Sequence, residues 1–548
     1  MKKNIWKWLC LVSVFTACVD DKGNYDYNEL AEITVENLPA QPYELLGYVD
    51  HIKISPKIIS SIEGEIKSGD PNYTVRYRLG YKGMGSLGGV DEDKQQSIAF
   101  LDVTPESGFD LDIPANYSPT VYVMWMTITD NRTNVVTSLQ FDISISSTTS
   151  EGWLVLCNEG EQERARLDMI SQLTSTRIET LHDVASGMPE CHHATCIGFV
   201  PKMSNPGNVI TVFTHEDDYM LDQETLESGP EQEFNMTNFS IQPDETLFKE
   251  YSFAASTYNW LLKYRFGFAE SGNAYVLVGG SAGESYGLPI NTFEPGSTET
   301  FKVAPYAGFS WMRPWGADFA ANALFYDTDN QRFVYFVGAT NFGDGYLCLF
   351  PIQEPDAPLF SYSTGKNLLY MEGTSRNGLV CSVLEDEAGN RSLYGINMST
   401  NEPTQELYID RIEATDIEKA TQFAFYSRGP LMFYAVGNKV YMYNYATRVS
   451  SPVTEVDLEP GEEITQIKFN LFRNSDLPSL NKYGNEAFMN KQYQLIVASY
   501  NNAASGVNNG KVGFYNIDQS GLDYVVTKDS EYKGFAKVVD VVYRERTE

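Results

Sequence analysis

Histidine and cysteine are scarce in this chain of 548 residues, with five and seven copies. Because histidine is the side chain most often used as a general acid or base, its scarcity argues against acid–base catalysis. Cys10 and Cys18 lie near the N-terminus, and the five remaining cysteines are an odd number, so a disulfide framework is excluded. The chain also has no His-Glu-x-x-His motif and no phosphate-binding loop. Its 73 acidic residues leave a carboxylate pair for glycoside cleavage open.

Basic residues are also few: 40 lysines and arginines stand against 73 aspartates and glutamates, so the formal net charge is −33. Without residues 1–17, which carry three lysines and no acid, the charge becomes −36. A surface of this sign repels nucleic acid and anionic lipid, and we expect no nucleic-acid partner. It suits a protein displayed outside a cell, or one that binds cations, although solubility alone also accounts for it.

No segment between residues 28 and 548 is apolar enough to span a bilayer. Residues 1–17 have a basic start, a short apolar stretch at 9–15 and small residues before Cys18, which is typical of a secretory signal peptide. Phe15-Thr16-Ala17-Cys18 resembles the lipobox of bacterial lipoproteins, which implies cleavage before Cys18 and a diacylglycerol on its thiol. We therefore predict a signal peptide over 1–17 and a lipidated tether over 18–30. The alternative is a plain secreted protein with a chance cysteine.

The residues after Cys18 carry a family resemblance. The run Asp20-Asp21-Lys22-Gly23-Asn24-Tyr25-Asp26-Tyr27 is similar to the start of the PKD-like family of Bacteroidetes surface lipoproteins. The acidic residues behind the cysteine also resemble the surface-export signal of such lipoproteins. The resemblance implies a surface-exposed lipoprotein, lipid-anchored in the outer membrane. It further implies an accessory subunit of a nutrient-uptake system, beside a TonB-dependent barrel and a lipoprotein lid of the starch-utilisation type, with a peptide or oligosaccharide as ligand.

Residues 31–148 alternate in short strands, at 32–35, 51–58, 73–79, 121–129 and 138–146. Strands of this length and spacing predict an immunoglobulin-like β-sandwich. Thr127-Ile128-Thr129-Asp130 resembles the strand-turn of domains of the polycystic-kidney-disease (PKD) type. The tryptophan usual in the middle strand of that family is missing, and Tyr77 or Tyr81 takes its place. The Ser/Thr-rich residues 146–150 mark the domain boundary.

The clearest hairpin is at 431–445, where two alternating apolar runs flank Gly437-Asn438, residue types that tolerate the positive φ of a tight turn. Similar pairs recur from Trp153 to the C-terminus, and a further strand-like run precedes each pair except the first. A spare run lies at 538–543. Seven radial sheets over 152–548, closed when 538–543 joins the first sheet, explain this count. We therefore predict an all-β chain, a sandwich followed by a seven-bladed β-propeller, with six or eight blades as alternatives.

Three predicted links between blades hold unusual residues. They are 171–194, the stretch before a run at 264–269 and the stretch before a run at 323–326, which we expect on one face of the propeller. The last two carry aromatic rings and an arginine, which suit stacking and a forked hydrogen bond to a peptide or sugar. The alternative is that these rings plug the channel or wedge between blades. The predicted ligand-binding residues are Trp260, Tyr306, Trp311, Arg313 and Trp315.

The first link also holds four potential metal ligands in six residues, Cys191, His192, His193 and Cys196. Zinc or copper accepts these donors, but the spacing matches no zinc signature. Two further interpretations are a disulfide between the two cysteines and an ordinary loop with free thiols. Acidic stretches at 327–330 and 385–390 suggest calcium, although Asp, Asn and Gly there are better explained as turn formers. We predict neither a metal nor a cofactor.

Together these patterns predict a non-enzymatic ligand-capture or scaffold protein at the cell surface. One alternative is a propeller hydrolase acting on glycans or peptides, which requires two opposed carboxylates in the channel. Another is capture of a metal or siderophore by the cysteine and histidine loop.

Overall fold

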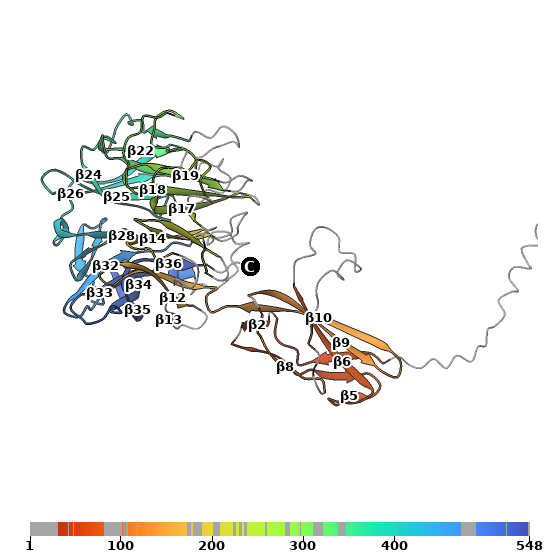
Figure 1. Cartoon of the computed structure of the whole chain (residues 1–548). Coiled ribbons are helices and arrows are strands. Elements are labelled where there is room, and N and C mark those ends of the chain that lie inside the picture. Colours follow the sequence, from red (N-terminus) through yellow and green to blue (C-terminus); the bar gives the residue numbers. More distant parts are fainter. Residues whose placement is uncertain are drawn as a thin grey trace, which may run out of the picture. The chain divides into compact units, whose positions relative to one another are not determined.

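The computed structural model describes residues 31–545, apart from 42, 48, 82–100, 104, 106–107, 118, 173–176, 179–188, 201–208, 223–225, 230–232, 235–237, 258–259, 280–284, 296, 311–321, 338–346, 400–401, 473–488 and 522. The predicted signal peptide, Cys18 and the tether lie outside the described residues. The chain divides into two compact units, Met1–Ser147 and Thr148–Glu548 (Figure 1). In the described part, no helix is long and apolar enough to cross a membrane. Apart from the short 3-10 turns η4 (Ile417–Lys419) and η5 (Lys491–Tyr493), the named elements are strands, so the predicted all-β class is confirmed.

The N-terminal unit is a β-sandwich. A five-stranded sheet has the order β2-β10-β9-β6-β7, a three-stranded sheet has the order β1-β4-β5, and β3 pairs with β8. Its strands are β1 (Ile33–Glu36), β2 (Tyr43–Leu46), β3 (His51–Ile54), β4 (Lys57–Ser60), β5 (Gly64–Ile66), β6 (Tyr73–Tyr81), β7 (Leu101–Asp102), β8 (Leu111–Pro114), β9 (Thr120–Asp130) and β10 (Val135–Ser146). Tyr77 lies fully buried in its core, and its hydroxyl donates to the Phe109 carbonyl at 2.7 Å. Tyr77 of β6 is therefore a core residue of the sandwich.

The C-terminal unit is a β-propeller, as the sequence predicts, and its described strands form seven antiparallel sheets. From the innermost strand outward, the first three are β36 (Lys537–Arg544), β11 (Gly152–Glu159), β12 (Arg164–Ser171) and β13 (Arg177–Ile178); β14 (Ala194–Val200), β15 (Val209–Thr214) and β16 (Asp218–Leu221); and β17 (Leu247–Thr257), β18 (Trp260–Ala269) and β19 (Ala274–Gly279).

The other four sheets of the propeller have four strands each. They are β20 (Gly308–Phe309), β21 (Ala323–Asp327), β22 (Arg332–Phe336) and β23 (Leu349–Pro351); β24 (Asn367–Gly373), β25 (Leu379–Glu385), β26 (Arg391–Asn397) and β27 (Thr404–Ile409); β28 (Gln422–Tyr426), β29 (Leu431–Val436), β30 (Lys439–Asn444) and β31 (Val449–Pro452); and β32 (Glu462–Lys468), β33 (Leu495–Asn501), β34 (Gly510–Ser520) and β35 (Asp523–Phe535). The number of blades itself stays a prediction.

The last strand of the chain completes the first sheet (Figure 1). β36 runs antiparallel to β11, with Tyr543 opposite Trp153. The Trp153 ring packs 4.9 Å from the Tyr543 ring and 4.8 Å from the Phe514 ring of the seventh sheet, measured between centroids. β36 also contacts β14 and β32, the innermost strands on either side of it. The predicted closure by residues 538–543 is confirmed, and it removes a sheet edge that would otherwise be open.

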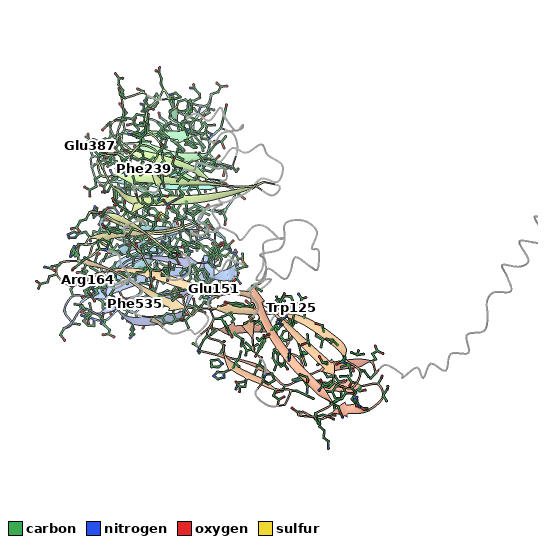
Figure 2. The ribbon with its side chains drawn as sticks, turned by 45° about the vertical axis from the view of Figure 1, so that its right-hand side comes forward. Trp125, Glu151, Arg164, Phe239, Glu387 and Phe535 are labelled. Carbon is green, nitrogen blue, oxygen red and sulfur yellow. The ribbon has the colours of Figure 1, made fainter. Side chains whose placement is uncertain are left out.

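Apolar side chains fill the space between neighbouring sheets of the propeller. Phe239 and Phe535, labelled in Figure 2, are buried, whereas Glu387 lies exposed at a turn. Between the third and fourth sheets, the Phe266 ring lies 5.3 Å from Phe325 and 5.4 Å from Phe336, with both pairs edge-on. Edge-on aromatic pairs add stability beyond the area they bury, so these layers strengthen the packing between neighbouring sheets.

Two sheets differ from the sequence-based interpretation. The runs 264–269 and 323–326 are not innermost strands, because they belong to β18 and β21, the second strands of their sheets. The innermost strands there are β17 and the two-residue β20. Tyr286 forms an isolated bridge with Phe239 outside the named strands.

This shift changes where the predicted binding residues lie. The stretches that hold Trp260 and residues 311–315 join an innermost strand to the second strand of the same sheet. The stretch 171–194 instead leads into an innermost strand, β14. Because the innermost strands are arranged alike around the ring, the chain enters each at one end and leaves at the other. The described residues at Trp260 and at 189–193 therefore lie at opposite ends of their innermost strands, so these two stretches do not share one face as predicted. Residues 311–321 lie outside the described residues.

Candidate functional site

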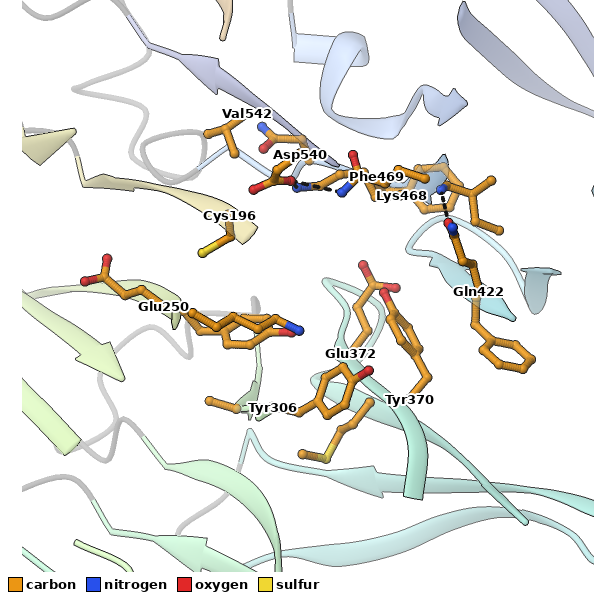
Figure 3. A pocket seen from close by; sticks show the side chains of 18 of the residues that line it. Cys196, Glu250, Tyr306, Tyr370, Glu372, Gln422, Lys468, Phe469, Asp540 and Val542 are labelled. Carbon is orange, nitrogen blue, oxygen red and sulfur yellow. Dashed lines mark hydrogen bonds and ion pairs between the residues drawn. The ribbon is translucent and has the colours of Figure 1, made fainter. Parts of the chain in front are cut away.

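The innermost strands of the seven sheets surround a cavity of about 380 Å³ (Figure 3). Residues from β14, β17, β24, β28, β32 and β36 line it, together with Tyr306, Ala307 and Phe309 at β20. Its polar lining consists of Thr195, Cys196, Lys249, Glu250, Tyr251, Ser252, Tyr306, Tyr370, Glu372, Thr421, Gln422, Thr465, Gln466, Lys468, Asn470 and Asp540. A cavity of this size suits a small ligand, so we take this central pocket as the candidate site.

Five of the innermost strands carry a one-residue bulge near their start. In β14, Ala194 pairs with Thr214 and Cys196 with Phe213, which leaves Thr195 without an opposite residue. The equivalent extra residues are Phe248 in β17, Leu369 in β24, Thr465 in β32 and Val539 in β36. A bulge resets the alternation of side chains along a strand. The residue after each bulge lines the pocket: Cys196, Lys249, Tyr370, Gln466 and Asp540.

Side chains from the innermost strands hydrogen-bond the backbone of the next innermost strand, and we call these contacts channel clamps. Gln422 of β28 donates to the Thr465 carbonyl of β32 at 2.7 Å and accepts from the Ile467 N–H at 2.8 Å. Gln466 of β32 donates to the Val539 carbonyl of β36 at 3.1 Å. These clamps satisfy backbone groups on the free edge of each sheet, which otherwise has no partner strand.

The channel clamps continue around the ring. Asp540 accepts the Ile197 N–H of β14 at 2.9 Å, and the Thr195 hydroxyl donates to the Phe248 carbonyl of β17. The Tyr306 hydroxyl donates to the Leu369 carbonyl of β24 at 3.2 Å, and Glu372 accepts the Phe425 N–H of β28 at 2.7 Å. Six junctions between innermost strands are thus clamped in the described part of the ring. Six polar residues of the pocket, Thr195, Tyr306, Glu372, Gln422, Gln466 and Asp540, therefore have a structural role.

Two carboxylates of the pocket are held in different protonation states. Asp540 forms an ion pair with Lys468 at 2.7 Å. Burial opposes ionisation of Asp540, but Lys468 and the hydrogen bonds from the Ile197 N–H and Gln466 outweigh it and lower its pKa. Burial instead raises the pKa of Glu372 to about 7, against the hydrogen bond from the Phe425 N–H. Asp540 is therefore ionised at neutral pH, whereas burial shifts the titration of Glu372 upward to about neutral pH.

The junction between β17 and β20 has a cation and aromatic rings where the others have clamps. The Lys249 ammonium lies 4.4 Å from the centre of the Tyr306 ring and 5.2 Å from that of Tyr251. The Tyr306 ring lies edge-on to Tyr370 at 5.6 Å, and these rings face the cavity in Figure 3. Burial lowers the pKa of Lys249 to about 8. Aromatic faces with a nearby ammonium can bind a ligand that has both an apolar face and a polar group.

Of the predicted ligand-binding residues, Tyr306 lies in the central pocket. The backbone of Trp260 pairs with Thr257 where β17 turns into β18, and its side chain is not among those described. Trp311, Arg313 and Trp315 lie outside the described residues. The roles predicted for these four residues stay predictions.

The cysteine and histidine loop does not gather into one site. Cys191 and Cys196 are buried free thiols. The His192 ring lies 3.2 Å from the Glu216 carboxylate, and the His193 ring lies 3.0 Å from Glu163. Among the residues that the structure describes, no group of three or more His, Cys, Asp or Glu is placed to hold a metal. The described geometry therefore favours the interpretation of an ordinary loop over a disulfide.

Both acidic stretches form turns. Asp327 accepts hydrogen bonds from the Asn330 N–H at 3.0 Å and from Arg332 at 2.9 Å. Asp386 accepts the Asn390 N–H at 2.8 Å. Short Asp and Asn side chains that bond nearby backbone in this way are typical of turns between paired strands.

The sequence gives little warning of the central pocket. Lys249, Tyr251, Tyr370, Glu372 and Asp540 were not among the predicted site residues. The one available signal was polar residues inside apolar runs, such as Asp540 in the spare C-terminal run and Glu372 after Leu368–Met371 of β24. The bulges hide this signal, because they break the two-residue period from which strand faces are predicted.

Comparison with known proteins supports the domain order. Residues 18–188 match the sequence model of the PKD-like family, a span that covers the described sandwich and β11–β13 of the first propeller sheet. The N-terminal part of the chain is therefore PKD-like, as its resemblance implies. Among curated proteins, none matches the sequence.

Several solved structures resemble the chain at low similarity. A quinonprotein alcohol dehydrogenase-like protein from Bacteroides thetaiotaomicron is 10% identical, with a TM-score of 0.35, and the match covers 94% of this chain and 97% of that one. A DUF4784 family protein from Bacteroides caccae is 10% identical, with a TM-score of 0.29 and coverage of 77% and 95%. The periplasmic gluconolactonase of Pseudomonas aeruginosa is 10% identical, with a TM-score of 0.41 and coverage of 72% and 99%. At this similarity, none of them carries an argument about function.

Proposed function

We propose that this protein is a lipid-anchored accessory protein of the bacterial outer-membrane surface, which captures a peptide or oligosaccharide in its central pocket without chemically altering it. The observation that carries the proposal is the unclamped junction of the channel, where Tyr251, Tyr306 and Lys249 face the cavity. The Tyr306 hydroxyl clamps β24, but among the described residues the Tyr306 ring, Tyr251 and Lys249 form no clamp between β17 and β20. They are therefore the groups best placed to bind a ligand.

The anchoring part of the proposal rests on the N-terminus. Phe15-Thr16-Ala17-Cys18 has the pattern of a lipobox, and the PKD-like match begins at Cys18. A thiol carrying diacylglycerol, with a further amide-linked chain, anchors a protein stably because each buried CH₂ adds ~0.8 kcal/mol. On the basis of the family resemblance, we further propose a TonB-dependent barrel and its lipoprotein lid as partners.

Capture is favoured over hydrolysis because the pocket carboxylates already have structural partners. Asp540 holds Lys468 and a backbone N–H, and Glu372 holds another backbone N–H. A Gly-x-Ser-x-Gly sequence does occur at 279–283, following β19. The serine elbow of hydrolases requires a strand, a sharp turn and a helix, and residues 280–284 lie outside the described residues.

The test of anchoring and partners is extraction from the native outer membrane in mild detergent. The tagged wild-type protein should incorporate labelled fatty acid and co-purify with a TonB-dependent barrel. Cys18→Ala should abolish the labelling and release the protein from the membrane. Labelling that persists in Cys18→Ala, or a wild-type extract without a barrel, would remove this part of the proposal.

The test of capture is binding to a panel of peptides and oligosaccharides. Tyr306→Ala should weaken the best binder at least tenfold, which is about 1.4 kcal/mol, because ring contacts concentrate binding energy. Tyr306→Phe keeps the ring and loses only the hydroxyl bond to Leu369, so it should retain most of the affinity. Tyr500→Ala, outside the pocket, is the matched control. Equal binding by wild type and Tyr306→Ala would place the ligand elsewhere.

A further inference from the structure

Lys249 occupies a place on its strand that two channel clamps occupy on theirs, but it forms no clamp. It follows a bulge, as Gln466 and Asp540 do, and so occupies the equivalent place on its strand. Gln466 and Asp540 each bond the backbone of a neighbouring innermost strand. The Lys249 ammonium instead lies against the Tyr251 and Tyr306 rings. Within the described part of the chain, it has no carboxylate at ion-pair distance.

We propose that the ligand of the central pocket carries a carboxylate, which the Lys249 ammonium binds while the rest of the ligand lies against the tyrosine rings. This inference rests on the proposed capture function and specifies its ligand. A cation held inside a cavity loses hydration, and it recovers that loss by pairing with an anion. Aromatic rings supply only part of that compensation.

The other charges of the pocket leave this role to Lys249. Lys468 is paired with Asp540 and Glu250 with Arg265, so the charges of each pair cancel. The Glu372 carboxylate on β24 accepts a hydrogen bond from the Phe425 N–H. Cys196 on β14 is buried in the lining of the pocket. Four lining atoms, Glu250 Oε1, Thr465 Oγ1, Gln466 Oε1 and Asn470 Nδ2, are buried without a hydrogen-bond partner in the described structure. These atoms can serve hydroxyl or amide groups of the same ligand.

The pH dependence of binding follows from the groups that face Lys249. These are Glu250 and Tyr251 on its own strand and Cys196, Tyr306, Tyr370, Glu372, Lys468 and Asp540 from the others. The pKa of Lys249 is lowered to about 8 and that of Glu372 is raised to about 7, in both cases by burial. As pH rises through these values, Glu372 gains negative charge and Lys249 loses positive charge. Both changes weaken the binding of a carboxylate.

Two kinds of ligand that fit the pocket carry a carboxylate beside an apolar face: an acidic sugar and a short peptide with a free C-terminus. The experiment therefore measures by calorimetry how tightly two matched pairs of probes bind to the full-length protein in detergent. One pair is a galacturonic-acid disaccharide and the neutral galactose disaccharide. The other is trialanine and its C-terminal amide. Binding of one acid and not the other identifies the source.

The expected result at pH 6.5 is that at least one acid binds ten times or more tighter than its neutral partner. Lys249→Met should abolish that difference, and Lys249→Arg should restore most of it. Lys439→Met, an exposed lysine in β30, is the control and should leave the difference unchanged. At pH 9 the wild-type preference should fall at least fivefold. Melting curves establish that each variant is folded.

Three results would overturn the inference. They are equal binding of acid and neutral probes, a preference that survives Lys249→Met, and no binding of either acid. Equal binding that is lost in Tyr306→Ala would leave the capture function standing while the carboxylate is rejected. Failure of the whole ligand panel described above would instead reject capture itself.

Discussion

The carboxylate of Asp540 accepts a hydrogen bond from the backbone N–H of Ile197, although 343 residues separate them in the chain. The same carboxylate binds Lys468 on the other neighbouring strand. One side chain of the last strand therefore links the second and seventh sheets of the propeller across the first. The ring is closed in two ways, by the pairing of β36 with β11 and by this contact at its centre.

Removal of the last strand should open the ring. Deleting residues 537–548 removes Val538, Val541, Val542 and Tyr543, all buried, and each such side chain contributes ~1.5–3 kcal/mol. The truncated protein should aggregate, because the edge of β11 becomes free. Size-exclusion chromatography and thermal melting measure both effects. Deleting only residues 546–548 is the control, since Arg544 and Glu545 are buried and should be kept. A soluble longer truncation with an unchanged melting temperature would contradict the closure.

Asp540→Ala should cost the fold ~3–5 kcal/mol, because it leaves Lys468 and the Ile197 N–H without their partner. Asp540→Asn keeps an acceptor and should cost less. The folded pKa of Asp540 is lowered, so its contribution is present above about pH 4 and is lost as pH falls through the folded value. The free energies of unfolding of the wild type and of Asp540→Asn, measured in urea, should therefore converge as the pH falls. Parallel curves from pH 7 down to pH 3 would contradict this role.

Glu372 should make the fold less stable as the pH rises near neutrality, which is opposite to the effect of Asp540. Its folded pKa is raised to about 7, so the stability it contributes is full below about pH 4 and is lost as pH rises through 7. Glu372→Gln keeps an acceptor for the Phe425 N–H and has no charge to bury. We expect the melting temperature of the wild type to fall more steeply than that of this variant between pH 5 and 8. Identical slopes would mean that Glu372 is ionised throughout.

The ion pair of Arg265 and Glu250 should be costly to break from one side. Both side chains are 1% exposed, and Glu250 also accepts a hydrogen bond from the Tyr286 hydroxyl at 2.9 Å. Arg265→Met should destabilise the propeller by ~3–5 kcal/mol, since a buried charge is left unpaired. Adding Glu250→Gln should recover part of that loss in chemical denaturation. Lys419→Ala, in an exposed pair with Asp416, is the control and should cost under ~1 kcal/mol.

Much of the propeller could be predicted because its outer strands follow simple rules. The hairpin of β29 and β30 turns at Gly437, whose φ of 60° is the positive value expected there. The spare run at 538–543 revealed the closure, since an unpaired apolar strand must find a partner. Both features depend on local alternation and on counting, which a sequence displays directly.

The innermost strands were harder to predict, for a physical reason. β17 begins Leu247-Phe248-Lys249-Glu250-Tyr251, where the bulge at Phe248 and two adjacent charges remove the alternation of a buried strand. Arg265 stabilises the charge of Glu250, and the Tyr306 ring lies against the charge of Lys249, although both groups are distant in the sequence. The central pocket is formed by residues from seven separate stretches, so no single stretch predicts it.

Because the chain is synthesised from its N-terminus, closure of the ring is delayed until the last strand has been made. The Tyr543 hydroxyl donates to the Glu151 carboxylate, which lies 392 residues earlier. At ~5–20 residues per second, the first sheet therefore waits roughly 20–80 s for its innermost strand. Throughout that interval β11 presents an unpaired edge. A chain with this architecture therefore completes its first sheet only after its last strand has been made.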